Sequence, residues 1–256
     1  MLRRFGKPFF IILFWAVVWE AAARIVGNSI FLVGPVDTVV NLVSLLPQPD
    51  FWKTVGFSCG RIFGGYGLAV LLGFLLGALA CAVPLVGELL SPVMHLMKSI
   101  PVASFVILAI LWVGSQRLTF FVVFVIAAPV IYTATVTGLK QTPKDMLEVS
   151  QVFRVGLPKR IWYVYRPALW PHLLSAASVS MGLAWKSGVA AEVIGICDHS
   201  IGEKLYMSKL FLETKDLFAW TIVIVLLSFL SEKLVMLLLR RLSVPEAEPE
   251  KREVEP

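Results

Sequence analysis

Six apolar stretches, each close to the length of one bilayer crossing, constrain this chain more than any other feature of its sequence. They cover residues 8–26, 57–82, 99–114, 118–138, 172–196 and 216–240. A helix needs about 20 apolar residues to cross hydrocarbon about 30 Å thick. The stretches lack the alternation of barrel strands, so helices are the remaining way to pair every backbone group in lipid. The sequence predicts an all-α membrane protein with about six transmembrane helices.

Composition and charge agree with this class and predict an orientation. The chain is 58% hydrophobic and 16% charged, with a formal net charge of +6, whereas soluble domains are about 45–50% apolar. Lys and Arg concentrate near both termini and in the loop 139–171. Under the positive-inside rule, both termini and this loop are cytoplasmic. Because topology explains the positive charge, we expect no nucleic acid partner.

The apolar organisation ends near residue 244. We expect residues 1–244 to form one transmembrane domain and residues 245–256, which are almost entirely Pro, Glu, Lys and Arg, to form a disordered cytoplasmic tail. The basic start of the chain and Ala21–Ala23 also allow a cleaved signal peptide. Trp19 and Glu20 instead give the first stretch an amphipathic outer end, which is typical of a retained helix.

The loop between the fourth and fifth stretches is the most distinctive polar segment. Residues 148–167 are basic and too polar to lie in lipid. A helix-forming run begins at Glu148, a turn is expected at Gly156 and Pro158, and an apolar helix is expected to begin just past Pro167. This pattern predicts a helix-turn-helix elbow at a membrane surface, where another protein docks.

One motif suggests a catalytic alternative. Gly56-Phe57-Ser58-Cys59-Gly60 matches the Gly-x-Ser-x-Gly pattern of serine hydrolases, so an intramembrane serine hydrolase using Ser58 is the alternative function. The serine lies at the start of a predicted helix, and the three histidines are predicted at the opposite interface or in loops, where none would serve as its base. A membrane scaffold or a secondary carrier is a third possibility.

No cofactor site is expected in this chain. No phosphate-binding loop of the Gly-xxxx-Gly-Lys-Ser/Thr type occurs, so any nucleotide must be bound by another protein. The three cysteines, Cys59, Cys81 and Cys197, show neither the spacing of a metal site nor that of a disulfide framework.

The fifth stretch contains candidate pathway residues. Lys186 and Glu192 lie six residues apart, and Trp185 precedes the lysine. A charge in lipid is costly, so such residues usually face a polar path or pair with another helix. We interpret Trp185, Lys186 and Glu192 as candidates to line a pathway. The plainer alternatives are packing for Trp185 and an interfacial position for Glu192.

Two other segments carry structural expectations. Residues 57–82 contain Gly-xxx-Gly spacings, which let another helix approach closely. Residues 85–97 mix polar and apolar side chains and are expected to lie along the inner membrane interface.

The loop resembles the cytoplasmic signature of the permease subunits of bacterial ABC importers, in their nitrate, taurine and aliphatic-sulfonate branch. That signature runs Glu-Ala-Ala, three residues, Gly, nine residues, a branched apolar residue, any residue, Leu-Pro. The matching positions in this chain are Glu148, Val149, Ser150, Val164 and Pro167. Arg154 stands where the family has Gly, and Arg166 stands where it has Leu. Gly156, two places later, is a candidate to supply the same turn. Segments 32–35, 100–114, 182–185 and 190–192 also resemble this family.

The resemblance implies a permease fold of the type I importer kind, with a cytoplasmic coupling helix that seats in a groove of an ATPase. The residues assigned to this coupling loop are Glu148, Val149, Ser150, Arg154, Gly156, Pro158, Lys159, Arg160 and Pro167.

The resemblance also implies the partners. A second permease copy would complete a homodimeric pathway, and two cytoplasmic ABC ATPase subunits would bind ATP and Mg. An extracytoplasmic solute-binding protein would deliver a small solute, such as nitrate, a sulfonate or taurine. The permease itself would be no enzyme and would bind no cofactor. It would span the inner membrane of a bacterium.

Overall fold

The computed structural model describes the backbone of residues 2–242 and the side chains of residues 10–241. All regular structure in this part of the chain is helical, which confirms the all-α class. The predicted tail, residues 245–256, lies outside the described residues. The helices are α1 Leu2–Val26, α2 Pro35–Leu45, α3 Pro49–Ala82, α4 Pro84–Ser99, α5 Val102–Lys140, α6 Lys144–Val152, α7 Leu157–Arg160, the π-helix η1 Ile161–Tyr165, α8 Arg166–Gly195, α9 Ile201–Leu210 and α10 Thr214–Leu242.

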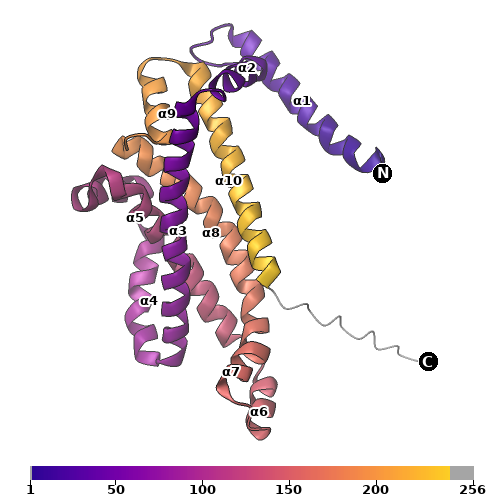
Figure 1. Cartoon of the computed structure of the whole chain (residues 1–256), viewed down its shortest axis with the longest axis vertical. Coiled ribbons are helices and arrows are strands. Elements are labelled where there is room, and N and C mark those ends of the chain that lie inside the picture. The colour runs from indigo at the N-terminus through magenta and orange to yellow at the C-terminus, as the bar shows by residue number, and fades with distance from the viewer. Residues whose placement is uncertain (1, 243–256) are drawn as a thin grey trace.

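The long helices α3, α8 and α10 run along the long axis of the molecule (Figure 1). Helices α2 and α9 lie at the upper end in this view, and α6 and α7 lie at the lower end. Helix α1 extends away from the bundle. Within the described residues, α3, α5 and α10 are long and apolar enough to cross a membrane. The count of six crossings stays a prediction.

Helix α5 is two helices that fold back on each other at Gly114. Gly114 has φ 70° and ψ 168°, which is not helical. The rings of Phe105 and Phe121 lie 5.8 Å apart, whereas 16 residues of straight helix would separate them by about 24 Å. The break falls between the predicted stretches 99–114 and 118–138, which confirms that they are separate. Residues 102–113 extend only about 18 Å, so this segment does not cross the hydrocarbon alone.

The prediction that residues 85–97 lie along the inner interface is wrong. Helix α4 lies alongside the lower half of α3 (Figure 1), and Met94 is buried with Ala80 and Tyr132. The reason is the tight connection at Val83, which is extended with φ −126° and ψ 103° and is followed at once by Pro84. Proline suits the first turn of a helix, so the chain reverses there. We call α4 together with residues 102–113 the return segment, because α4 runs back alongside α3.

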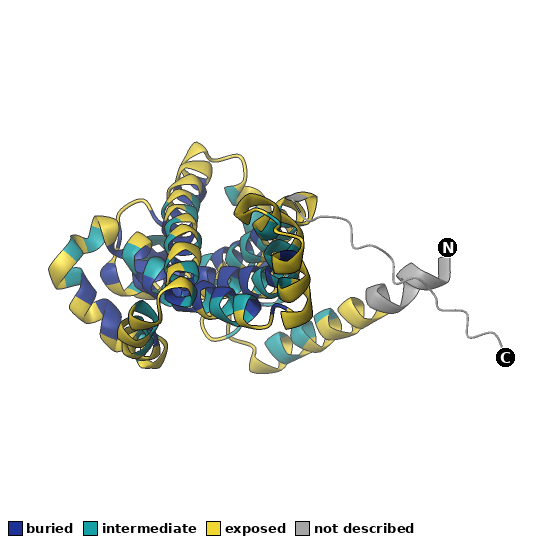
Figure 2. Cartoon of the chain, turned by 90° about the horizontal axis from the view of Figure 1, so that it is seen from below, coloured by how far each residue is buried: buried dark blue, intermediate teal, exposed yellow. Residues whose placement is uncertain are grey.

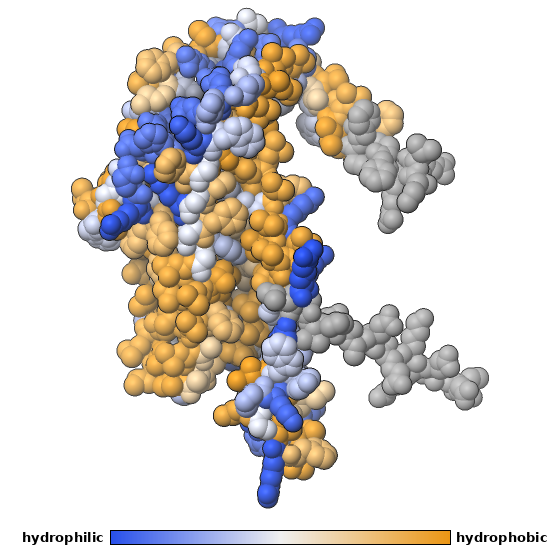
Figure 3. Space-filling view, in the orientation of Figure 1, coloured by the Kyte–Doolittle hydropathy of each residue, from blue (hydrophilic) through white to orange (hydrophobic). Residues whose placement is uncertain are grey.

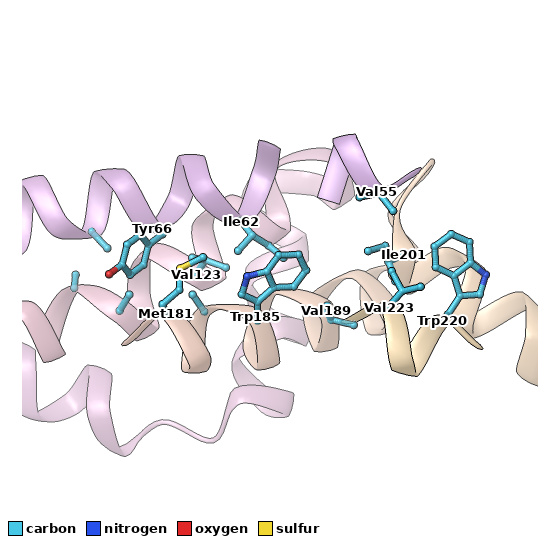
Figure 4. Packing of buried hydrophobic residues seen from close by; sticks show 14 of the residues in the cluster. Val55, Ile62, Tyr66, Val123, Met181, Trp185, Val189, Ile201, Trp220 and Val223 are labelled. Atoms are coloured by element: carbon cyan, nitrogen blue, oxygen red, sulfur yellow. The ribbon is translucent and has the colours of Figure 1, made fainter. Parts of the chain in front are cut away.

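The core lies where α3, α5 and α8 meet. Ile62 from α3, Val123 from α5, and Met181 and Trp185 from α8 share one buried cluster (Figure 4). Buried residues gather in the middle of the bundle, and the outer faces are exposed (Figure 2). These exposed faces are strongly apolar, as expected of helices that face lipid.

Glycines bring these three helices close together, as the sequence predicted for α3. A Cβ atom added at Gly73 would lie 2.8 Å from the carbonyl oxygen of Ala128, and one at Gly77 would lie 2.7 Å from Cβ of Thr135. On α8, a Cβ at Gly188 would lie 2.9 Å from Ile62. By contrast, a Cβ at Gly67 would meet nothing within 4 Å. Only some of the glycines are therefore needed for packing within the chain.

We expect Gly73→Ala to destabilise the bundle, because the new methyl group must push α5 away. Overpacking of this kind costs about 1–3 kcal/mol. The midpoint of thermal unfolding in detergent should fall for Gly73→Ala. The control is Gly67→Ala on the same helix, which should leave the midpoint unchanged or raise it. Equal midpoints for the two variants would contradict the close approach of α3 and α5.

Candidate functional site

The elbow at the lower end of the molecule consists of α6, the turn after it, and α7 (Figure 1). Its tip carries large apolar side chains that the described residues leave uncovered: Val152 is 78% exposed and Phe153 is 76% exposed. Val149 and Leu157 are also exposed. In the space-filling view, hydrophilic and hydrophobic residues are mixed there, below the continuous apolar surface of the bundle (Figure 3). An apolar tip on a polar projection is typical of a protein docking surface.

The turn after α6 is made by Arg154. Its φ is +49°, in the left-handed region. The N–H of Arg154 donates to the carbonyl of Gln151 at 2.9 Å, and the N–H of Val155 donates to the carbonyl of Ser150 at 2.8 Å. These two bonds form a Schellman motif, in which glycine is the usual left-handed residue. The geometry explains why glycine suits this position in the signature, although this chain has arginine.

Gly156 does not supply this turn, contrary to the suggestion from the sequence. Its φ is −61° and its ψ is 151°, an ordinary extended conformation that any residue adopts. It serves as the N-cap of α7, and Pro158 lies in the first turn of that helix.

The apolar helix expected just past Pro167 corresponds to α8, which begins at Arg166, but the backbone before it is already helical. The backbone is helical from Leu157 onward, through α7 and η1 into α8. Pro167 lacks an N–H, and its ring would clash with the carbonyl four residues earlier in a regular α-helix. The helix widens just before it, where the N–H of Arg166 donates to the carbonyl of Ile161. A π-turn therefore accommodates the proline, and the elbow is continuous with α8.

The structure brings the predicted coupling residues together on the elbow, with different exposures. Glu148, Val149, Arg154, Pro158 and Lys159 are exposed, and Arg160 is half-buried. Ser150 is buried, and its hydroxyl donates to the carbonyl of Leu147 at 2.7 Å. Pro167 lies farther along, in the first turn of α8.

The sequence analysis did not anticipate an aromatic stack at the start of α8. The guanidinium of Arg166 lies 3.8 Å from the centre of the Trp162 ring and 5.6 Å from that of Trp170. Cation–π contacts of this kind stabilise by about 0.5–2 kcal/mol. The i, i+4 spacing of Trp162, Arg166 and Trp170 places them on one helix face and is the signal that would have identified the stack.

The three candidate pathway residues do not lie together. Trp185 is fully buried in the core against Ile62 (Figure 4), which agrees with the packing alternative. Glu192 is fully buried, so it does not reach an interface. Lys186 is exposed on the opposite side of α8 from Gly188, which packs on α3 and α5. Val179 and Ile194 share this exposed face, and a Cβ at Gly182 would meet nothing within 4 Å.

Glu192 and Ser58 form a buried polar joint between α3, α8 and the first turn of α9. The Ser58 hydroxyl donates to Oε2 of Glu192 at 2.8 Å and accepts from the N–H of Ile201 at 2.9 Å. The N–H of Gly202 also donates to Oε2 of Glu192, at 3.2 Å. Spacing in the sequence gave no sign of this joint, because its partners are 134 and 143 residues apart.

The joint removes the support for a serine hydrolase. Ser58 lies inside the continuous helix α3, its side chain is fully buried, and its hydroxyl hydrogen points to a carboxylate. The Gly-x-Ser-x-Gly motif of a serine hydrolase instead places the hydroxyl on an exposed strand-turn-helix elbow, with a base in reach.

A polar network covers the joint at the surface. The guanidinium of Arg61 donates to the side chain of Gln116 at 2.7 Å and to the backbone carbonyl of Asp198 at 3.3 Å. Gln116 in turn donates to the Asp198 carboxylate at 2.7 Å. These bonds join α3, the turn of α5 and the α8–α9 loop. The upper end of the bundle is thus tied together by side chains.

Comparison with known families identifies this arrangement. Residues 69–244, which include the return segment, the elbow and α8, match the family described as binding-protein-dependent transport system inner membrane component. The chain belongs to this family. It is therefore a permease subunit of an ABC importer, and ATP is hydrolysed by a separate chain.

Individual relatives of this permease are named for small solutes. The taurine transport system permease protein TauC of Escherichia coli (strain K12) is 26% identical over 234 residues, covering 89% of this chain and 84% of the relative. The nitrate import permease protein NrtB of Synechococcus elongatus is 28% identical and covers 72% of this chain and 70% of the relative. The bicarbonate transport system permease protein CmpB of Synechocystis is 30% identical over 145 residues, and the match spans about half of that relative, 51%.

Solved structures show the same permease fold. A chain of the inward-facing MetNI methionine ABC transporter matches with a TM-score of 0.59 and 17% identity, covering 75% of this chain and 94% of the other. A chain of a bacterial ABC transporter involved in alginate import matches with a TM-score of 0.59 and 12% identity, covering 93% and 96%.

We expect Arg154→Gly to stabilise the elbow of this permease, because a non-glycine residue in the left-handed region costs about 1–2 kcal/mol. Part of this gain is lost to the greater freedom of glycine in the unfolded chain, so about 1 kcal/mol should remain. Hydrogen exchange at the N–H of Val155, corrected for its intrinsic rate, should slow by about fivefold.

Gly156→Ala is the control for this experiment. A Cβ at Gly156 would meet only Pro158, at 3.9 Å, so this variant changes exchange at Val155 only through the freedom of the unfolded chain and measures the size of that effect. Faster exchange in Arg154→Gly would show that the left-handed turn does not strain the elbow.

Proposed function

We propose that this permease forms half of a homodimeric translocation pathway in the inner membrane of a bacterium, with its elbow seated in a groove of a cytoplasmic ATPase. The observation that carries this proposal is the elbow itself. It projects from one end of the bundle, exposes an apolar tip, and is continuous with a helix that reaches the other end (Figure 1).

Two features of the elbow allow a movement of α6 to be passed on to α8. The Schellman turn closes α6, and the stack of Arg166 on Trp162 stiffens the start of α8. A displacement of α6 by an ATPase therefore reaches α8 without a flexible joint. Closure of two ATPase subunits would then bias the bundle between inward-open and outward-open arrangements.

The family and the geometry support the proposed partners. Two ATPase subunits bind ATP and Mg, a second permease copy completes the pathway, and a solute-binding protein meets the end opposite the elbow. The elbow and the end of α10 lie toward the same end of the molecule (Figure 1). This supports a common side of the membrane for the elbow and the end of α10, and we propose from the charge pattern that this side is cytoplasmic. We also propose that the exposed carboxylate of Glu148 pairs with a basic residue of the ATPase.

Among the pathway candidates, we propose that Lys186 lines the pathway. Its exposed face of α8 is otherwise apolar, and the salt bridges found among the described residues do not include Lys186. A lysine on such a face is costly against lipid and acceptable against water or a polar partner. Relatives are named for bicarbonate, taurine and nitrate, so we propose a small solute of this kind as the cargo.

We expect Phe153→Asp to weaken binding of the ATPase by about thirtyfold or more, because an aromatic anchor buried at an interface contributes 2 kcal/mol or more. The matched control is Phe31→Asp, since Phe31 is also 76% exposed but lies far from the elbow. The measurement is co-purification of a phosphate-loop ATPase with the tagged permease in mild detergent, identified by mass spectrometry. Glu148→Gln should give a smaller loss in the same assay.

Equal recovery of the ATPase with Phe153→Asp and Phe31→Asp would refute docking at the apolar tip. Unchanged association and unchanged transport-coupled hydrolysis in Glu148→Gln would refute the ion pair alone.

We expect Val179→Cys, which lies on the Lys186 face, to react with water-soluble thiol reagents. Leu226→Cys on α10, with similar exposure, should not react, because lipid covers it. Both variants are made in a background without the native cysteines, in native membranes. An anionic methanethiosulfonate should react faster than a cationic one, and Lys186→Gln should reduce that preference several-fold, since Lys186 is the nearby positive charge. If Val179→Cys stays unreactive with and without ATP, this face lines no aqueous pathway.

A further inference from the structure

The joint of Ser58 and Glu192 holds α9 by the start of its helix. The N–H groups of Ile201 and Gly202, in the first turn of α9, have no partner within their own helix, and the joint supplies acceptors for both. The acceptors belong to α3 and α8. A carboxylate at a helix N-terminus is also favoured by the helix dipole.

Packing leaves α9 no room to slide on α8. A Cβ added at Gly202 would overlap Cβ of Glu192 and the backbone of Val193. Ile201 is fully buried in the same cluster as Ile62 and Trp185. The Ser200 hydroxyl caps α9 by accepting from the N–H of Glu203 at 3.0 Å. The first turn of α9 is thus fixed in position and direction.

Helix α8 connects this joint to the elbow. Glu192 lies in the last turn of α8, and the first turn of α8 follows η1 at the elbow. Between them, Gly188 packs on Ile62, one turn beyond Ser58 on α3. A shift of the elbow therefore moves α8, and α8 moves α9 through the Glu192 carboxylate.

We propose that Ser58 and Glu192 are positioning residues that make α9 move as one body with α3 and α8 when the ATPase shifts the elbow. The proposal rests on the proposed function. Among the described residues, Oε1 of Glu192 has no geometric hydrogen-bond partner, and the donors of Ser58 and Gly202 both meet at Oε2. Among the described residues, an ion pair between Lys204 and Asp50 also links α9 to α3, but it is exposed and contributes little.

The first test measures hydrogen exchange of the α9 amides in the full permease. Ser58→Ala leaves the Ile201 N–H unpaired, and Glu192→Ala removes the carboxylate. Each should speed exchange in α9 by roughly ten- to a hundredfold, the effect of losing one buried partner. Ser187→Ala is the matched control. Ser187 is also buried, on α8, but its hydroxyl donates to Leu183 and Ala184 of its own helix, so α9 should exchange as in the unchanged chain.

The second test asks whether the joint transmits movement. Spin labels replace the exposed residues Lys209 on α9 and Lys53 on α3, in a background without the native cysteines. Labelled chains are diluted with unlabelled ones and assembled with the ATPase. The distance between the labels should be single and equal with and without trapped ATP. In Ser58→Ala and Glu192→Ala it should become broad and dependent on ATP, while Ser187→Ala keeps the original distribution.

The two tests separate the possible failures. Unchanged α9 exchange in both variants would overturn the joint, even in a permease that binds its ATPase normally. A Lys209–Lys53 distance that changes with ATP in the unmodified chain would overturn the rigid unit. Failure of the unmodified permease to recruit the ATPase would count against the proposed function and not against the joint. Gly202→Ala, which alters no polar atom, provides an independent variant: it should loosen α9 by steric overlap, and unchanged exchange there would also count against the joint.

Discussion

Close packing of α3, α5 and α8 is the contact on which the rest of the structure depends. Lipid tails are as apolar as leucine, so burial alone does not drive these helices together. Glycines on α3 and α8 let the backbones approach until side chains of the facing helix fill the space. The same three helices carry the turn at Gly114, the elbow and the joint. Their spacing therefore fixes where each of these features lies.

Helix α8 links the two ends of the molecule. It begins against the stack of Trp162 and Arg166 and ends with Glu192 bound to the start of α9. Its buried face contains Trp185 and Gly188, and its exposed face contains Lys186. One helix thus combines the proposed connection to the ATPase, the packing against the core and the face proposed for the pathway. A helix that is held along its length transmits a displacement as a rigid element.

The sequence alone predicted the apolar helices, the break near Gly114 and the elbow, because each depends on local composition. It placed residues 85–97 wrongly, since an amphipathic segment suits an interface as well as a bundle. It missed the joint because hydrogen bonds between residues 134 positions apart leave no local pattern. It also assigned Glu192 to an interface or a pathway. A buried carboxylate within a membrane is costly unless a neighbouring helix supplies hydrogen-bond donors. Here α9 supplies the N–H of Gly202.

The end of helix α8 departs from the rule that glycine occupies the left-handed position at a helix C-terminus. Helix α8 ends with Gly195 followed by Ile196, and the left-handed residue is the isoleucine, with φ +45°. Gly195 is needed elsewhere, because a Cβ there would overlap Leu118 of α5. The N–H of Cys197 bonds to the carbonyl of Glu192 at 3.1 Å and closes the turn in spite of the strain. At the elbow, Arg154 is likewise a left-handed residue that is not glycine, but Gly156, two positions later, is not required by packing. At the end of α8, packing therefore decides where the glycine stands, and a hydrogen bond holds the strained Ile196 at the turn.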